Sequence, residues 1–202
     1  MTEARIVRPF SAPVARLRGR DRVLAQRAAA SLALMASCEA SGAPLALERD
    51  ESGKPLETNG WFHSRAHTVG LAVAAVAREP IGIDVESLDR RRLGAVRTKY
   101  ADELARLGDD SVATCLGLWC AKEALVKRSG IGVADLPKVR FEAREGVVWQ
   151  FRYSGALERV LVRIHGSHVV AIAAGALDVH AVRDVNGDQT SKPSTHELEV
   201  NA

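Results

Sequence analysis

Residues 81–86 read Ile-Gly-Ile-Asp-Val-Glu, an apolar strand pattern that carries two carboxylates. Side chains alternate between the two faces of a strand, so Asp84 and Glu86 project from the same face. An apolar strand in the middle of a fold rarely places two carboxylates on one face without a counter-charge. Strand capping and surface salt bridges are the ordinary alternatives, but the pattern favours a metal site.

A second segment, residues 119–127, reads Trp-Cys-Ala-Lys-Glu-Ala-Leu-Val-Lys and has the pattern of a helix. Glu123 and Lys127 lie one turn apart on one helix face. As an exposed pair they would only stabilise the helix, but this helix is apolar almost all round, and burial favours a functional carboxylate. Two carboxylates on a strand, a third on a helix and an ammonium can together hold Mg²⁺ against a phosphate.

The other apolar patterns predict an α+β chain. A helix is expected over 21–41, with Asp21 as its N-cap and with a buried apolar stripe of Val23, Leu24, Ala28, Leu32 and Met35. Further helices are predicted over 99–107 and 112–129, the second ended by Gly130 and Gly132, and 88–98 is a loop or short helix. Strands are predicted over 45–48, 69–76, 81–85, 138–143, 147–153, 160–165 and 169–174.

Composition is that of an ordinary globular protein, with 47% hydrophobic and 26% charged residues over 202 positions. No apolar run reaches the ~18 residues that a membrane span needs, and arginines interrupt any signal-peptide core. The three cysteines, Cys38, Cys115 and Cys120, fit buried thiols in a reducing cytosol better than disulfides. We therefore expect a cytoplasmic protein, and the high Ala and Arg content indicates a GC-rich bacterial genome.

Positive charge is concentrated near the N-terminus. Residues 1–27 contain seven arginines and two acids, whereas the whole chain has a net charge of only +3. Guanidinium groups pair with phosphates and carboxylates, so this segment favours a phosphate ligand or an acidic partner. A nucleic-acid-binding module is a rival interpretation, but the segment lacks the interleaved aromatic residues of a base-stacking surface.

The Gly-Ile-Asp-Val-Glu and Trp-x-x-Lys-Glu-Ala-x-x-Lys segments, with Glu123 following Asp84 by 39 positions, resemble the signature of the 4′-phosphopantetheinyl transferase superfamily. Upstream, Gly53-Lys54-Pro55 and the residues from Phe62 to Thr68 look like the family's Gly-Lys-Pro and Phe-Asn-x-Ser-His-Ser stretch. Three positions depart from that stretch: Ser64 replaces Asn, and Ala66 and Thr68 replace serines. The similarity is with the larger, surfactin-synthetase-activating type and runs from about Arg22 to about Gly175.

This resemblance implies an α+β fold built as a pseudo-dimer of two similar halves, with one active site between them. Residues 1–80 would form the N-terminal half, which binds coenzyme A (CoA), and residues 81–183 the half with the metal and catalytic motifs. Residues 184–202 are polar and are expected to form a disordered tail. Because the two halves complete one site, the expected state is a monomer.

The resemblance also implies roles for single residues. The Mg²⁺ ligands would be Asp84, Glu86 and Glu123, and Mn²⁺ could replace Mg²⁺. CoA would be bound by Lys54, His67, Arg22, Lys122 and Lys127, with Arg27 as a rival to Arg22. The catalytic groups would be Glu123, Lys127 and Glu103, and the proton of the substrate serine would pass to Glu123, to Glu103 or to a metal-bound water.

The implied activity is transfer of 4′-phosphopantetheine from CoA to a serine of an apo acyl or peptidyl carrier protein, with release of 3′,5′-ADP. The carrier would serve fatty-acid, polyketide or non-ribosomal-peptide synthesis, and neither a membrane nor a nucleic acid is an expected partner. A catalytically degenerate CoA- or nucleotide-binding paralogue is the alternative, supported by the altered Ser64, Ala66 and Thr68. The intact set of three carboxylates argues against it.

Overall fold

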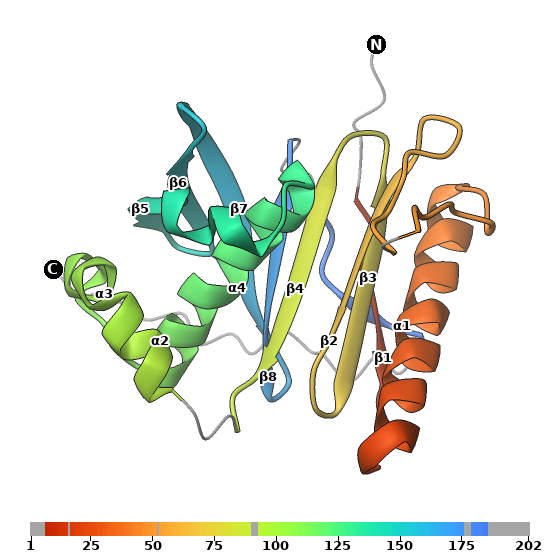
Figure 1. Ribbon diagram of the computed structural model, residues 1–202, viewed down its shortest axis with the longest axis horizontal. Helices are drawn as coiled ribbons and strands as arrows, with labels where there is room; N and C mark the ends of the chain where they lie inside the picture. Colours follow the sequence, from red (N-terminus) through yellow and green to blue (C-terminus); the bar gives the residue numbers. More distant parts are fainter. Residues whose placement is uncertain (1–6, 16, 52, 90–92, 176–178, 186–202) are drawn as a thin grey trace, which may run out of the picture.

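The computed structural model describes residues 7–15, 17–51, 53–89, 93–175 and 179–185. Most of the predicted tail, 186–202, and some of the N-terminal arginines, such as Arg5 and Arg16, lie outside these residues. The described part of the chain is mixed α+β, with two sheets that lie side by side and helices over them (Figure 1). The predicted α+β class is therefore confirmed.

The first sheet has the strand order β2-β3-β1-β9. Its strands are β1 (Phe10–Pro13), β2 (Phe62–His67), β3 (Leu71–Ala77) and β9 (Arg183–Asp184). Helix α1 (Gly19–Ser41) follows β1 and packs on β1 and β3. The contact is made of small side chains, Ala29, Ala30 and Ala33 against Ala12, Ala72 and Ala74, which let the helix approach the sheet closely.

The second sheet has the order β4-β8-β7-β6-β5 and is antiparallel throughout. Its strands are β4 (Ile81–Ser87), β5 (Arg140–Glu145), β6 (Val148–Tyr153), β7 (Ala156–His165) and β8 (His168–Ala174). Three helices separate β4 from β5: α2 (Gly94–Lys99), α3 (Ala101–Leu107) and α4 (Val112–Ser129), followed by the 3₁₀ turn η1 (Val133–Lys138). Helix α4 packs on β4, β7 and β8.

The core lies in three layers, because each sheet has one face under a helix and one face toward the other sheet. Helix α1 and the first sheet enclose the alanine cluster, and α4 and the second sheet enclose a larger cluster that includes Leu116, Phe151 and Val169. The faces away from the helices share a third cluster, in which Val73 of β3 belongs with Ile83 of β4 and Ile172 of β8. This central layer joins the two sheets into one body.

Several predicted elements are confirmed. Helix α4 has the predicted bounds; Ser111 caps its first turn by accepting from Thr114 N, and Gly130 (φ 68°) ends it. The predicted strands at 69–76, 81–85, 147–153, 160–165 and 169–174 correspond to β3, β4, β6, β7 and β8. The predicted 138–143 strand begins slightly later, as β5, because η1 occupies the residues before it.

Other predictions were wrong. Helix α1 begins at Gly19, so Asp21 lies in its first turn and is not the N-cap. The stripe predicted to be buried is exposed, with Leu24, Leu32 and Met35 at 53%, 55% and 44%, because the alanine face packs on the sheet instead. No strand forms over 45–48; apart from an isolated bridge at Arg49, this stretch is irregular, and Leu45 is exposed.

Among the residues described, no helix is both long enough and apolar enough to cross a bilayer.

Candidate functional site between the two sheets

Helix α4 lies against one face of β4, and Gly82 makes this approach possible. A Cβ added at Gly82 would lie 1.8 Å from the carbonyl oxygen of Ala124, so no larger residue fits there without movement of the helix. The next residue on the same face is Asp84, which is buried, and Glu86 follows it partly exposed. The alternation read from the sequence therefore places both carboxylates toward α4.

Helix α4 contributes a cation to this face. The Lys127 ammonium lies 2.6 Å from Asp84 Oδ1 and donates a second bond to the Ile83 carbonyl at 3.2 Å. Glu123, one turn earlier, is half-buried. Burial and the charge of Asp84 raise the pKa of Glu123, and the ammonium groups of Lys127 and Lys99 oppose that shift. Glu86 also raises it, so the three carboxylates share one electrostatic environment.

The chemistry of this group fits a divalent cation. Three carboxylates face one close ammonium, an excess of negative charge with oxygen donors of the kind that Mg²⁺ prefers. Within the described ranges, however, no three His, Cys, Asp or Glu side chains converge tightly enough to enclose a metal ion. Asp84 is engaged by Lys127 instead. The metal ligands Asp84, Glu86 and Glu123 thus remain a prediction, which the excess of negative charge at this position supports.

A cavity of about 730 Å³ opens beside α4, between the first sheet and the end of that helix. Its lining comes from both halves and includes Arg49, Lys54, His63, Arg65, Glu123, Lys127 and Arg128. Lys54 follows Gly53 (φ 83°), and its ammonium lies close to Gly130, where an added Cβ would meet Nζ at 2.9 Å. The predicted CoA-binding Lys54 therefore borders the same cavity as Glu123 and Lys127.

We call Asp84, Glu86 and Glu123 the acidic group. A smaller cavity of about 320 Å³ lies between Asp84 of this group and residues of α1 and β2. It is lined by Arg27, Ala30, Arg49, Arg65, Ala66, His67, Asp84 and Lys127. The structure thus brings His67 to the same cavity as Asp84 and Lys127. Burial lowers the pKa of His67, and the ammonium of Lys127 lowers it further.

Arg27, the rival of Arg22 in the sequence, lines this smaller cavity. Arg22 is exposed on α1 and lines neither cavity between the sheets. The two arginines are five positions apart, which on a helix places them on different faces. Of the two candidates, only Arg27 is placed where it could contact a ligand held near Asp84.

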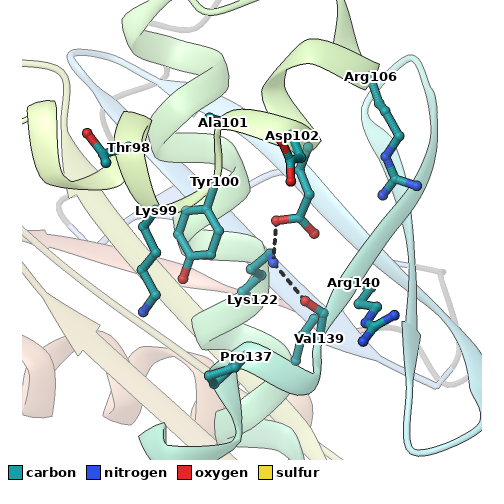
Figure 2. A pocket seen from close by; sticks show the side chains of 11 residues that line it. Thr98, Lys99, Tyr100, Ala101, Asp102, Arg106, Lys122, Pro137, Val139 and Arg140 are labelled. Atoms are coloured by element: carbon teal, nitrogen blue, oxygen red, sulfur yellow. Dashed lines mark hydrogen bonds and ion pairs between the residues drawn. The ribbon is translucent and has the colours of Figure 1, made fainter.

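Lys122 and Glu103 form an ion pair at a third cavity, where Figure 2 shows Lys122 with Tyr100 and Val139. The Lys122 ammonium lies 2.6 Å from Glu103 Oε2 and donates to the Val139 carbonyl at 2.7 Å. The other Glu103 oxygen accepts from Phe141 N at 2.7 Å. Both residues line a separate cavity of about 520 Å³, so the structure does not bring Lys122 to the cavities that hold Lys54 and His67.

Sequence reasoning missed several cavity residues, among them Arg49, His63 and Arg65. Two of these three belong to β2. His63, Arg65 and His67 lie at every second position of this strand and so share the face toward α1, where Arg65 Nη1 donates to Ser31 Oγ. Burial lowers the pKa of His63 to about 4, and the guanidinium groups of Arg49 and Arg65 add to the shift. A basic side chain at every second position is a sequence signal that could have predicted this strand and its basic face.

Cys120 lies on the face of α4 toward β4 but is not exposed. Its thiol is within 3.9 Å of the Val169 carbonyl, and burial raises its pKa well above the ordinary value. Cys38 and Cys115 are also buried and free. The prediction of buried thiols is confirmed, and a nucleophilic role for Cys120 is not supported, because the thiolate is the reactive form.

Comparison with known proteins finds similarity in the part of the chain that carries the acidic group. Residues 80–173 match the sequence model of the 4′-phosphopantetheinyl transferase superfamily. The chain is also 32% identical over 84 residues to 4′-phosphopantetheinyl transferase Sfp of Bacillus subtilis (strain 168). That alignment covers 39% of this chain and only 37% of the length of the relative. The resemblance to the 4′-phosphopantetheinyl transferase superfamily is therefore confirmed, and residues 80–173, which carry all three carboxylates, are the part of the chain that establishes it.

Proposed function

We propose that this protein transfers the 4′-phosphopantetheine group of CoA to a serine of an apo acyl or peptidyl carrier protein, releasing 3′,5′-ADP. One observation carries the proposal: basic side chains, among them Arg49, Arg65 and Lys127, line the same cavities as the carboxylates Asp84 and Glu123. A pyrophosphate with a divalent cation needs both signs of charge at adjacent positions. The family match over the acid-bearing half supports the same activity.

The cations around the two cavities are suited to the phosphates of CoA. Lys54 and Arg49 lie at the larger cavity, and His67 and Arg27 at the smaller one, with Lys127 lining both. Volumes of about 730 and 320 Å³ are in the range of small-molecule sites. We assign Lys54 to the 3′-phosphate and His67 and Lys127 to the pyrophosphate, following the resemblance.

Mg²⁺, or Mn²⁺ in its place, would be held by Asp84, Glu86 and Glu123. When bound, the metal would neutralise charge on the pyrophosphate and on the departing 3′,5′-ADP. Lys127 would turn from Asp84 toward the same phosphates, because an ammonium one-third exposed on a flexible side chain can reorient.

In the reaction the serine oxygen attacks the phosphorus that carries the pantetheine arm, and the bond from that phosphorus to 3′,5′-ADP breaks. Glu123 is our candidate to accept the serine proton, because it lines the larger cavity together with Lys127, whereas Glu103 is held in an ion pair by Lys122. Glu103, the other candidate, has both oxygens engaged, by Lys122 and by Phe141 N. Its contacts suit a residue that holds α3, α4 and β5 together.

We further propose that the two halves form a pseudo-dimer with one site between them, divided near residue 80 and functional as a monomer. The order β2-β3-β1 in the first sheet repeats as β7-β8-β4 in the second, each time with antiparallel pairing. In the first sheet β1 leads to α1 and then to β2 and β3; in the second, β4 leads to α4 by way of α2 and α3, and β5 and β6 come before β7 and β8. The free, buried cysteines fit a reducing cytoplasm.

The three departures from the family pattern do not favour a degenerate paralogue. Ser64 Oγ accepts from Ile83 N at 3.0 Å and so joins β2 to β4. Ala66 is buried in the central layer, and Thr68 keeps a hydroxyl, which donates to Glu86 at 3.4 Å. Each residue has a defined place next to the site.

The test is a mass-spectrometric assay. The protein is incubated with an apo carrier protein, CoA and Mg²⁺, and the expected product is a carrier with one phosphopantetheine on its serine. A carrier whose mass does not change, under conditions where CoA binding is measurable, would support the degenerate paralogue instead.

A further inference from the structure

Two histidines at the tip of the β7–β8 hairpin connect the second sheet to the first. His165 and His168 face each other across the turn that joins the strands. His168 Nε2 lies 2.9 Å from the Val69 carbonyl, in the turn between β2 and β3. His165 Nε2 lies 3.2 Å from Ser11 Oγ on β1 and 3.4 Å from Asp184 Oδ1 on β9. One hairpin thus contacts the first sheet at two separate places.

The bond from His168 has a defined direction. A carbonyl oxygen only accepts, so Nε2 of His168 carries the proton and donates to Val69. Nδ1 of the ring lies 3.4 Å from Ser167 Oγ, which can donate to it. The side chain is 9% exposed and packs against Gly70, whose φ of 86° suits glycine. His168 is therefore fixed against the β2–β3 turn.

That turn carries two groups of the candidate site. His67, directly before it, lines the cavity with Asp84 and Lys127. Thr68 donates its hydroxyl to Glu86 Oε2 at 3.4 Å. The hairpin tip also holds the strand that bears Glu86, because Leu88 N donates to the Ser167 carbonyl at 2.9 Å. The tip therefore contacts both segments that must stay in register at the site.

We propose that His168 is a positioning residue for the CoA phosphate site: its bond to the Val69 carbonyl sets the β2–β3 turn so that His67 and Thr68 face the acidic group. This inference rests on the proposed function, since it names the ligand that His67 contacts. His168 itself does not line either of the cavities between the sheets. Its partner His165 belongs to the same hairpin but holds β1 and β9, whose strand residues line neither cavity.

The pair of histidines provides a matched control. We compare His168→Leu, which removes the bond, and His168→Gln, whose amide can still donate, with His165→Leu. Calorimetry measures CoA binding, and hydrogen exchange measures protection of the Leu71 and Thr68 amides in the protein without ligand. We expect His168→Leu to weaken CoA binding about five- to tenfold, as for one lost hydrogen bond. His168→Gln and His165→Leu should stay within about twofold of the wild type.

Hydrogen exchange should follow the same order, with faster exchange at the β2–β3 turn only in His168→Leu. If that variant does not fold, His168→Asn removes the same bond with a polar side chain too short to reach Val69. Wild-type CoA binding in His168→Leu or His168→Asn, or an equal loss in His165→Leu, overturns the positioning role while leaving the proposed function intact. A wild-type protein that binds no CoA overturns the proposed function, and the role of His168 with it.

Discussion

The two sheets share the order of three strands, β2-β3-β1 and β7-β8-β4, but differ at the contact between helix and strand. In the first half, α1 meets β1 through alanines, with Ala12 opposite Ala30 and Ala33 in one cluster. In the second half, the corresponding face of β4 carries Asp84 and Glu86, and α4 brings Lys127 to Asp84. The same strand order therefore occurs with an apolar contact between helix and strand in the first sheet and with a charged contact in the second.

This difference indicates that the charges are not a requirement of the fold. Burying carboxylates is unfavourable unless they are paired, and the raised pKa of Glu123 shows that the pairing in the second half is incomplete. A helix and a strand with this connectivity can meet through small apolar side chains, as the first half shows. We infer that the acidic group serves ligand binding.

The cavities between the sheets combine both signs of charge. Residues before β4 supply Arg27, Arg49, Lys54 and Arg65 with Glu57, and β4 and α4 supply Asp84 and Glu123 together with Lys127 and Arg128. Burial lowers the pKa of His63 at this site, and the guanidinium groups of Arg49 and Arg65 lower it further. We infer that such cavities suit an anion that brings, or binds, a cation.

The largest expected effect follows from the closer approach of the helix in the second half. Gly82→Ala should lower the free energy of unfolding by about 3 kcal/mol or more, because the new methyl group meets the α4 backbone. The β1 residue Ala12 accommodates a methyl group in the same kind of contact. Urea unfolding measures the change.

The control for this substitution is Gly94→Ala, where an added Cβ meets no atom within 4 Å. It should change stability by no more than about 0.5 kcal/mol. Equal stability of the two variants would show that α4 and β4 are not in tight contact.

The next effect concerns His63 on β2 and is a change in how the free energy of unfolding depends on pH. His63 has its pKa lowered from 6.5 to about 4, so the folded protein binds this proton less readily than the unfolded chain. Stability from this residue is fully present above pH 6.5 and is lost as the pH falls through about 4. The total loss is about 3 kcal/mol.

His63→Gln should remove this part of the pH dependence, measured as unfolding free energy from pH 7 down to pH 4. An unchanged slope in the variant would mean that His63 is not held neutral by the cations around it. Arg49→Gln should give an intermediate slope, because Arg49 is one of two arginines that lower the pKa.

A smaller effect concerns Lys54, at the edge of the larger cavity. If Lys54 binds the 3′-phosphate, Lys54→Ala should raise the KM for CoA about tenfold and leave kcat largely unchanged. With dephospho-CoA, which lacks that phosphate, the wild type and the variant should behave alike. A full defect with dephospho-CoA would assign Lys54 to another group.

The parts of the molecule that the sequence predicted well are those with large apolar side chains. Helix α4 and the strands around it have continuous apolar patterns, and the motif residues Asp84, Glu86 and Glu123 fall on the elements expected for them. Their common face follows from the period of a strand and of a helix. The contacts of Lys127 with Asp84 and of His67 with the same cavity depend on tertiary packing.

The first half was harder to predict because its packing relies on small residues. The large side chains of α1 suggested the wrong buried face, since the alanines that pack closely on the sheet give a weak hydrophobic signal. Strand β2 is rich in basic residues, and β1 and β9 are only four and two residues long. β9 pairs with β1 over a separation that spans most of the chain, which no local pattern reveals.

The most direct test measures transfer and stability in parallel for Asp84→Ala and Glu123→Ala, with the exposed Asp102→Ala as control. If the acidic group serves catalysis and not folding, both variants should lose transfer by at least about a hundredfold at saturating Mg²⁺. Their unfolding free energies should stay within about 1 kcal/mol of the wild type, and the control should keep both properties. Near-wild-type transfer by either variant, or unfolding in place of inactivity, would contradict the account.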